Sequence, residues 1–247
     1  MRSELAVKSL YKSFGGLHVF EDLSFTLPAG EILGVIGPNG AGKTTLINVV
    51  SGQLLANKGQ VLLNGIDISQ MSFHGRSHRG LIRSFQHTNT FRTATVRENI
   101  ERAVSFSKGF NKPAIPHLTK LLKKFDLYQR LDQSSENLPY GLQKLLGLLL
   151  VYAASPNYMM LDEPAAGLES SERYMVDEFV KDALTNLECG VLIVEHDMEL
   201  VRRLCPTIMV LDDGRIIAQG NTEDVLQKDE VIQAYLGTAD EEEAQPC

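Results

Sequence analysis

The chain has 247 residues, of which 43% are hydrophobic and 22% charged, and this is the composition of a globular protein with a sizeable core. Its net charge of −7 argues against the basic surface that duplex nucleic acid requires, so we expect no nucleic-acid partner. No apolar window approaches the ~20 residues of a membrane-spanning helix, and the uncharged run at 145–154 reads as a buried helix.

Two further features of composition concern the compartment. The N-terminus carries an acid at Glu4 and lacks a long apolar run, so we expect no secretory signal and a cytoplasmic chain. The three cysteines are odd in number and widely spaced, which predicts neither a disulfide framework nor a metal site.

The first third of the chain alternates β-type runs with turns rich in glycine or proline. A helix is expected from Thr44 until Gly52 ends it, and a later hairpin should turn at Asn64-Gly65. This part therefore combines antiparallel strands with one strand-loop-helix unit. The predicted strands span residues 5–14, 18–27 and 31–37, and the hairpin spans 59–68.

The middle of the chain, from about residue 87 to 154, has a helical apolar pattern. Polar or proline-containing stretches separate its helices, and we expect an inserted helical subdomain. The predicted helices span residues 96–104, 116–127 and 141–154.

After residue 157, strands and helices alternate, which favours a mostly parallel sheet wrapped by helices. A closing hairpin is expected to turn at Asp213-Gly214. We expect one domain over residues 1–237 and an acidic, disordered tail over 238–247. The remaining predicted elements are strands at 158–163, 190–197 and 207–220 and helices at 171–188 and 198–204.

The stretch "GPNGAGKTT" lies between a predicted strand and a predicted helix. It fits the phosphate-loop pattern of a glycine, four residues, a glycine, a lysine and a hydroxyl residue. Glycines permit backbone conformations that turn successive N–H groups toward phosphate oxygens, and the helix N-terminus adds positive charge. An ordinary glycine-rich turn could share these letters, but the strand before and the helix after favour a polyphosphate site.

Each side chain of this loop has an expected role. Lys43 should reach the β- and γ-phosphates, Thr44 should ligate Mg²⁺, and Thr45 could meet the α-phosphate. The predicted nucleotide-binding residues are Gly37, Pro38, Asn39, Gly40, Ala41, Gly42, Lys43, Thr44 and Thr45.

The apolar strand "YMMLDE" ends in Asp162-Glu163. Parallel sheets place ligands beyond the carboxyl ends of their strands, so Asp162 is expected to hold Mg²⁺ opposite Thr44. Glu163 is then placed to orient the attacking water. An acidic pair at a strand end is also a common turn or cap, but the phosphate loop favours the metal and water roles.

Five further stretches match, in order and spacing, the ATP-binding subunits of ABC transporters, and the chain resembles that family from about Leu5 to Gly237. Details such as "RSFQHTNTF" and "DEPAAGL" look most like importers of branched-chain amino acids, with importers of urea and short amides as neighbours. The resemblance implies an α/β fold: a P-loop NTPase with a mostly parallel sheet, an N-terminal antiparallel β subdomain and an inserted α-helical subdomain. The five stretches are "KSFGG" (12–16), "RSFQ" (83–86), "LPYGLQK" (138–144), "AAGLE" (165–169) and "VLIVEHD" (191–197).

The resemblance also implies roles for single residues. Gln86 would contact Mg²⁺ and the attacking water and sense the membrane subunits, and His196 would be the switch histidine. Phe14 would stack on adenine, with Tyr11 as a rival, and Gly141 would belong to the signature sequence that faces the partner's ATP. Taken alone, Gln86 would read as a surface glutamine, His196 as a structural histidine and Phe14 as core.

The signature departs from the family pattern at Pro139 and Leu142, where a small residue and a glutamine are usual. Proline has neither a hydroxyl nor a backbone N–H, so residue 139 loses two potential donors to the γ-phosphate. Gly141 and the helix N-terminus remain. We expect that this subunit offers a weakened signature to the ATP on its partner, or else that the backbone of Tyr140 and Gly141 suffices.

The resemblance implies an ATPase that powers import through ATP-driven dimer closure, with ATP and Mg²⁺ as cofactors. Its expected partners are a second ABC subunit, identical or related, two transmembrane permease subunits and, indirectly, a periplasmic binding protein. It would lie peripherally at the cytoplasmic face of the inner membrane. The alternatives are a soluble ABC ATPase that acts as an assembly scaffold, and a regulatory module that binds ATP without hydrolysis.

Overall fold

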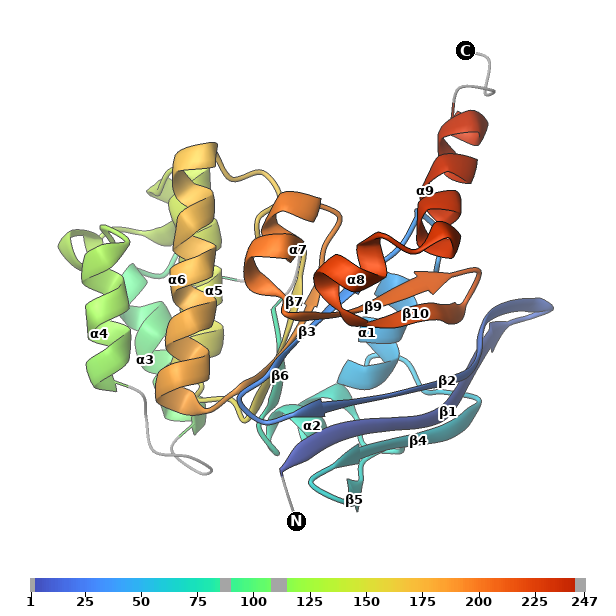
Figure 1. Ribbon diagram of the computed structural model, residues 1–247. Helices are drawn as coiled ribbons and strands as arrows, with labels where there is room; N and C mark the ends of the chain where they lie inside the picture. The colour runs from blue at the N-terminus through green and yellow to red at the C-terminus, as the bar shows by residue number, and fades with distance from the viewer. Residues whose placement is uncertain (1–2, 85–89, 108–114, 243–247) are drawn as a thin grey trace. The chain divides into compact units, whose positions relative to one another are not determined.

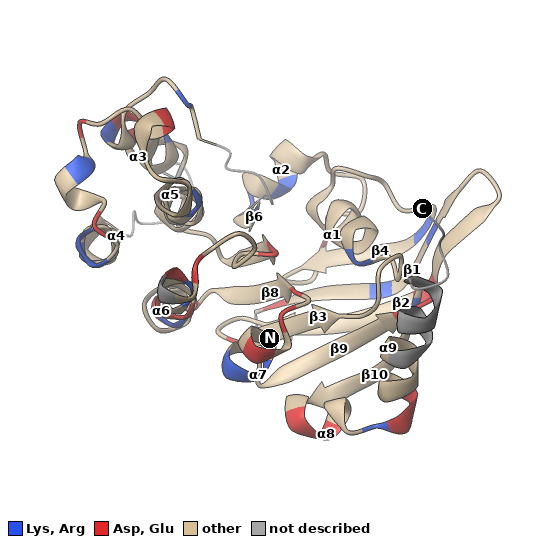
Figure 2. Ribbon diagram, turned by 90° about the horizontal axis from the view of Figure 1, so that it is seen from above, with Lys and Arg blue, Asp and Glu red and all other residues tan. Residues whose placement is uncertain are grey.

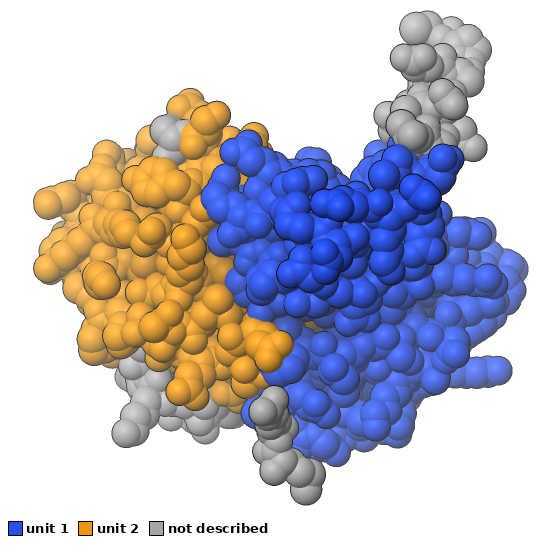
Figure 3. Space-filling model, in the orientation of Figure 1, with its two compact units in different colours: residues 1–28, 32–74, 192–247 blue, residues 29–31, 75–191 orange. Residues whose placement is uncertain are grey.

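The computed structural model describes residues 3–84, 90–107 and 115–242. The chain forms two compact units, and each is built from segments that are not contiguous in the sequence (Figure 3). The first unit comprises residues 1–28, 32–74 and 192–247, and the second comprises residues 29–31 and 75–191.

An antiparallel sheet in the first unit has the strand order β2-β1-β4-β5 (Figure 1). In β1 it buries the consecutive residues Leu5, Ala6 and Val7, and also Leu10. The turn between β4 and β5 has positive φ at Asn64 (52°) and Gly65 (79°), which is the geometry that favours Asn-Gly in a two-residue hairpin. The strands are β1 (Glu4–Phe14), β2 (Leu17–Pro28), β4 (Lys58–Leu63) and β5 (Ile66–Asp67).

A second group of strands in the first unit carries the phosphate loop. Every residue of β3 (Ile32–Ile36) is buried, and β3 pairs in parallel with β9 (Thr207–Asp212). The strand β9 pairs antiparallel with β10 (Arg215–Asn221) through the expected turn at Asp213-Gly214. Helix α1 (Lys43–Ser51) follows β3 and ends at Gly52, whose φ of 83° supplies the left-handed C-cap.

Three helices complete the first unit: α7 (Met198–Leu204), α8 (Thr222–Leu226) and α9 (Asp229–Glu242). In α7 an acid lies in the first turn and two arginines lie in the last, which suits the helix dipole (Figure 2). None of the helices within the described residues combines the length and the apolar content that a membrane span requires.

The second unit contains parallel strands and four long helices. The strands β6 (Leu81–Arg83) and β7 (Tyr158–Asp162) pair in parallel, and all five residues of β7 are buried. Helix α5 packs against α3, α4 and α6 through a buried row of leucines, including Leu145 and Leu149. The long helices are α3 (Val96–Ser107), α4 (Ile115–Lys124), α5 (Tyr140–Ala153) and α6 (Ser170–Leu187), and single 3-10 turns lie at Tyr128–Arg130 and Ser135–Asn137. The division between the two units falls inside β8 (Gly190–Val194).

The described elements agree with the predicted strands and long helices to within a few residues, with four additions. These additions, which the sequence did not predict, are α2 (Phe73–Ser77), β6, α8 and α9. The strand expected over 190–197 ends at Val194, because Asp197 caps α7. The expected tail boundary at residue 237 falls inside α9, which continues to Glu242.

Candidate functional site

The backbone of the phosphate loop requires its glycines. Gly37, Gly40 and Gly42 have φ of 151°, 82° and 98°, a region that side chains disfavour. A Cβ at Gly37 would lie 2.0 Å from the carbonyl oxygen of Leu211 in β9, so this position admits only glycine. Gly42 is the N-cap of α1, and the N-terminal amides of α1 therefore form an anion-binding end directly after the loop.

Lys43 places its ammonium group within the loop. Its Nζ donates to the carbonyl oxygens of Gly37 at 2.6 Å and Pro38 at 2.8 Å, and the side chain is half-buried. Thr44 is exposed and Thr45 half-buried in the first turn of α1. The loop thus fixes one positive charge one residue before the hydroxyls of Thr44 and Thr45.

The aromatic candidates lie on the β1–β2 hairpin. Val19 of β2 lies against the loop, because a Cβ at Gly42 would be 3.4 Å from its Cγ1. Phe14, at the end of β1, is 45% exposed, and Lys12 Nζ lies 4.6 Å from its ring centroid. The Tyr11 hydroxyl is instead hydrogen-bonded to His18 Nδ1. Phe14 therefore has an exposed ring with a lysine beside it, and its stacking on adenine stays a prediction.

His196 follows β8 at the strand end next to the phosphate loop. The amide of Glu195 donates to the carbonyl oxygen of Val35 in β3 at 3.3 Å, and β3 leads directly into the loop. His196 itself is exposed, and its amide donates to the buried Glu195 carboxylate at 3.2 Å. The first unit thus brings together the loop and the switch-histidine candidate at one end of its strands.

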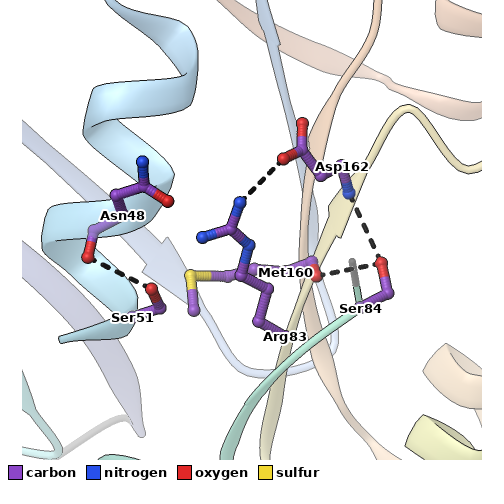
Figure 4. A network of polar contacts seen from close by, with 6 residues as sticks. All are labelled: Asn48, Ser51, Arg83, Ser84, Met160 and Asp162. Atoms are coloured by element: carbon purple, nitrogen blue, oxygen red, sulfur yellow. Dashed lines mark hydrogen bonds and ion pairs between the residues drawn. The ribbon is translucent and has the colours of Figure 1, made fainter. Parts of the chain in front are cut away.

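In the second unit, Asp162 ends β7 and is anchored by a buried ion pair (Figure 4). Arg83 Nη2 lies 2.8 Å from Asp162 Oδ2, and the two side chains are 5% and 9% exposed. Ser84 joins the same network, because its hydroxyl accepts from the Asp162 amide at 3.4 Å. Burial lowers the pKa of the Arg83 guanidinium, and the hydrogen bond to Asp162 opposes that shift.

Sequence reasoning missed Arg83, although "RSFQ" contains it. The signal was a cation within the apolar run "GLIRSF", since a buried arginine needs an acidic partner. Gln86, three residues later, lies outside the described residues, and its predicted role stays a prediction.

Replacing Arg83 with methionine is expected to lower the free energy of unfolding by about 3 kcal/mol, because the Asp162 carboxylate would stay buried without its cation. Urea unfolding of the purified variant measures the change. The matched control is Arg97→Met, which removes a surface pair with Asp132 whose side chains are 48% and 84% exposed. Equal decreases in the free energy of unfolding of the two variants would contradict the prediction that the buried pair stabilises the fold more than the surface pair.

Glu163 begins the turn that follows β7. Its φ of 47° is left-handed, which is uncommon for a residue with a side chain and is often found at functional sites. The turn is closed by the Ala166 amide, which donates to the Glu163 carbonyl oxygen at 3.2 Å. The side chain is half-buried, so one carboxylate next to Asp162 remains accessible.

Gly141 lies in the first turn of α5, and Pro139 is the N-cap of that helix without a side-chain cap bond. A Cβ at Gly141 would lie 2.0 Å from Glu172 Oε1, so a side chain at this position would require the Glu172 carboxylate to move. Glu172 completes the capping box of α6 with Glu169. The signature helix therefore packs on the start of α6 through a position without a side chain.

The candidate residues fall into both compact units. The phosphate loop, Phe14 and His196 belong to the first, and Gly141, Asp162 and Glu163 belong to the second. Over residues 3–84, 90–107 and 115–242, no group of three His, Cys, Asp or Glu side chains is placed to hold a metal ion.

Comparison with known proteins decides the family. The model of the ABC transporter family matches residues 20–166, which include the phosphate loop, Gln86, Gly141 and the two carboxylates. The chain belongs to the ABC transporter family. As an ABC ATP-binding subunit it binds ATP, and its hydrolysis of ATP is coupled to transport.

Two ABC relatives have similar overall identity. The high-affinity branched-chain amino acid transport ATP-binding protein LivG of Salmonella typhimurium is 33% identical over 250 residues, which cover 95% of this chain and 98% of LivG. The lipopolysaccharide export system ATP-binding protein LptB of Haemophilus influenzae is 31% identical, with the same coverage of both chains. Both names describe transport, which favours a transporter subunit over a soluble scaffold.

A solved ABC cassette has the same fold. MJ1267, an ATP-binding cassette of an ABC transporter in its ADP conformation, aligns with a TM-score of 0.82 at 26% identity, over 96% of this chain and all of that chain. The predicted fold class, an ABC-type P-loop NTPase with parallel and antiparallel sheets and helices, is confirmed.

Proposed function

We propose that this ABC subunit powers the import of branched-chain amino acids or of related small solutes such as urea and short amides. The observation that carries the proposal is the 33% identity to LivG over 95% of the chain. LptB is almost as similar at 31%, and it makes lipopolysaccharide export the second candidate. Both candidates use the same ATPase chemistry, so the transported solute distinguishes them.

Complementation tests this proposal. The chain is expressed in bacteria that lack the ATP-binding subunit of their branched-chain amino acid importer, and uptake of labelled leucine is measured. We expect uptake to recover with the natural chain and not with Lys43→Ala. If the chain instead rescued growth of an LptB-depleted strain and did not restore leucine uptake, the proposed function would be lipopolysaccharide export and not import.

Nucleotide binding rests on the first unit. The amides of residues 37–45 and the N-terminus of α1 would surround the polyphosphate, and Lys43 would donate to its β- and γ-oxygens in place of the Gly37 and Pro38 carbonyls. Phe14 would stack on adenine with its exposed ring. These contacts select a nucleotide by its charge and its base without sensing the transported solute.

Thr44, Asp162 and Gln86 would hold the magnesium ion. Bound there, Mg²⁺ would neutralise charge on the β- and γ-phosphate oxygens during transfer. The donor set fits, because a hydroxyl, a carboxylate and an amide oxygen are hard ligands and Mg²⁺ completes its shell with phosphate and water. Arg83 would hold the Asp162 carboxylate in place through their buried ion pair.

Hydrolysis would use the side chains that follow the strands β7 and β8. Glu163 would orient the attacking water and accept its proton, with Gln86 as a second contact to that water. His196 would complete the site from the end of β8, where Glu195 fixes its backbone. Positioning and electrostatic stabilisation account for most phosphoryl-transfer catalysis, so small displacements of these groups would slow the reaction strongly.

Coupling to transport would require two ABC subunits, identical or related. Each ATP would lie between the phosphate loop of one subunit and Gly141 of the other, and closure would drive two permease subunits through alternating access. ATP can impose this change only through its higher affinity for the closed state. The subunit would sit at the cytoplasmic face of the inner membrane, bound to the permeases, which a periplasmic binding protein supplies with solute.

Pro139→Ser tests the proposal that the signature is weakened. Serine restores a hydroxyl and a backbone N–H at the N-cap of α5, where the proline has no side-chain cap bond. One added hydrogen bond to a charged phosphate is worth about 1.5 kcal/mol, so turnover at the site that uses this signature should rise roughly tenfold. Unchanged ATPase activity of the assembled transporter would mean that the amides of Tyr140 and Gly141 suffice.

A further inference from the structure

Lys144 is a buried cation in an apolar helix. It lies four residues after the start of α5, is 6% exposed, and is followed by the buried residues Leu145 and Leu146. An ammonium group is strongly hydrated, so its burial requires well-placed acceptors. In the sequence of α5, Lys144 comes two residues after the signature residues Pro139 to Leu142.

The acceptors of Lys144 belong to the turn that carries Glu163. Lys144 Nζ donates to the carbonyl oxygen of Glu163 at 2.9 Å and also to the carbonyl oxygen of Ala166. The same turn is closed by the Ala166 amide, which donates to the Glu163 carbonyl at 3.2 Å. One ammonium group therefore holds both ends of the turn from the side of α5.

The backbone of Glu163 is the part of this turn that most needs support. Its left-handed conformation, with φ of 47°, costs free energy for a residue with a Cβ and persists where surrounding contacts enforce it. The bond from Lys144 acts on the peptide carbonyl of Glu163 itself. It therefore fixes the peptide plane next to the Cα from which the carboxylate projects.

We propose that Lys144 is a positioning residue for ATP hydrolysis, which fixes the Glu163 turn and ties it to the signature helix of the same subunit. Hydrogen bonds from a charged donor to carbonyls are stronger than neutral ones. The ammonium group therefore fixes the position of the turn relative to α5. A displacement of α5 by the partner's nucleotide would then reach Glu163 through two hydrogen bonds. The inference rests on the proposed role of Glu163 in hydrolysis.

The test compares Lys144→Met, which keeps most of the apolar stem and removes the donors, with Lys144→Arg, which keeps charge and donors. In steady-state ATP hydrolysis by the full chain, we expect Lys144→Met to lower kcat at least tenfold with KM for ATP within twofold. Lys144→Arg should recover kcat to within about threefold of the natural chain. A loss of kcat that is equal in the two variants would overturn the proposal.

A control in the same helix separates positioning from loss of a buried polar contact. Tyr152→Phe removes a hydrogen bond from α5 to Asp182 in α6, remote in sequence from the Glu163 turn. We expect this variant to keep kcat within twofold even if its melting temperature falls. If Tyr152→Phe lowered kcat as much as Lys144→Met, the effect would come from the loss of a buried polar contact in α5, and the positioning role of Lys144 would be refuted.

A double-mutant cycle tests whether Lys144 acts through Glu163. In the Glu163→Gln background, Lys144→Met should change the residual hydrolysis less than twofold, because the group that Lys144 positions is already removed. An undiminished tenfold effect in that background would overturn the inference and leave the role of Glu163 intact. Full activity of Glu163→Gln alone would instead overturn the proposed site.

Should Lys144→Met fail to fold by circular dichroism, Lys144→Gln is used, since it retains a shorter donor. A reduced kcat with unchanged KM, absent in the Glu163→Gln background, is again the expected result. Hydrogen exchange of the Ala166 amide, which donates to the Glu163 carbonyl, measures whether the turn has loosened. Unchanged kcat in a folded Lys144→Gln whose Ala166 amide exchanges faster than in the natural chain would contradict the proposal.

Discussion

Lys43→Ala should weaken ATP binding about 100-fold and bring ATP hydrolysis below detection. The variant loses the one cation that the phosphate loop fixes, 2.6 Å from the Gly37 carbonyl and at the end of β3. Two charge-assisted bonds to phosphate contribute about 3 kcal/mol together, which corresponds to that change in affinity. Calorimetric titration with ATP and a coupled phosphate-release assay measure the two effects.

The control for this prediction is Lys8→Ala, which removes an exposed lysine from β1 in the same unit. Its ATP affinity should equal that of the natural chain, which separates the loss of a specific contact from the loss of one positive charge. Normal ATPase activity in Lys43→Ala would refute the phosphate-loop site.

Glu163→Gln should bind ATP with nearly unchanged affinity and hydrolyse it at least 100-fold more slowly. Glutamine keeps the size of the side chain but cannot accept the proton of the attacking water, and such general-base contributions are typically 10²–10⁴-fold. Since hydrolysis reopens the proposed dimer, the variant should accumulate as an ATP-dependent dimer. Light scattering during gel filtration, with and without ATP, measures this.

Glu136→Gln is the matched control, because it removes an exposed carboxylate from the same unit. It should remain monomeric or dimeric as the natural chain does under the same conditions, with full turnover. Full turnover in Glu163→Gln would remove Glu163 as the base and leave Asp162 or a water network to be tested.

The elements that depend on local chemistry could be predicted from the sequence. The turns at Asn64-Gly65 and Asp213-Gly214 have the positive φ that these dipeptides favour, and Gly52 caps α1 as expected. The phosphate loop could also be predicted from the sequence, because its glycines, lysine and hydroxyl residues are contiguous.

Elements that depend on distant partners were missed. The strand β6 has only three residues and exists through its pairing with β7, and α2 has only five residues. Such segments carry too little periodicity to be distinguished from loops.

The same reason explains the missed site residues. Arg83 and Asp162 are 79 residues apart, and their ion pair exists only once β6 lies along β7. Lys144 reads as one polar residue in an apolar helix, and its acceptors are main-chain carbonyls, which no pattern of side chains reveals. The contiguous motifs thus indicated the chemistry, while the residues that orient it required the fold.

Calorimetric titration of the natural chain with ATP, ADP and AMP tests the central claim most directly. If residues 37–45 surround the nucleotide's phosphates, ATP and ADP should bind in the micromolar range and AMP should show no measurable heat, because AMP lacks the β-phosphate that the loop recognises. AMP binding as tightly as ATP would contradict a site built around the polyphosphate.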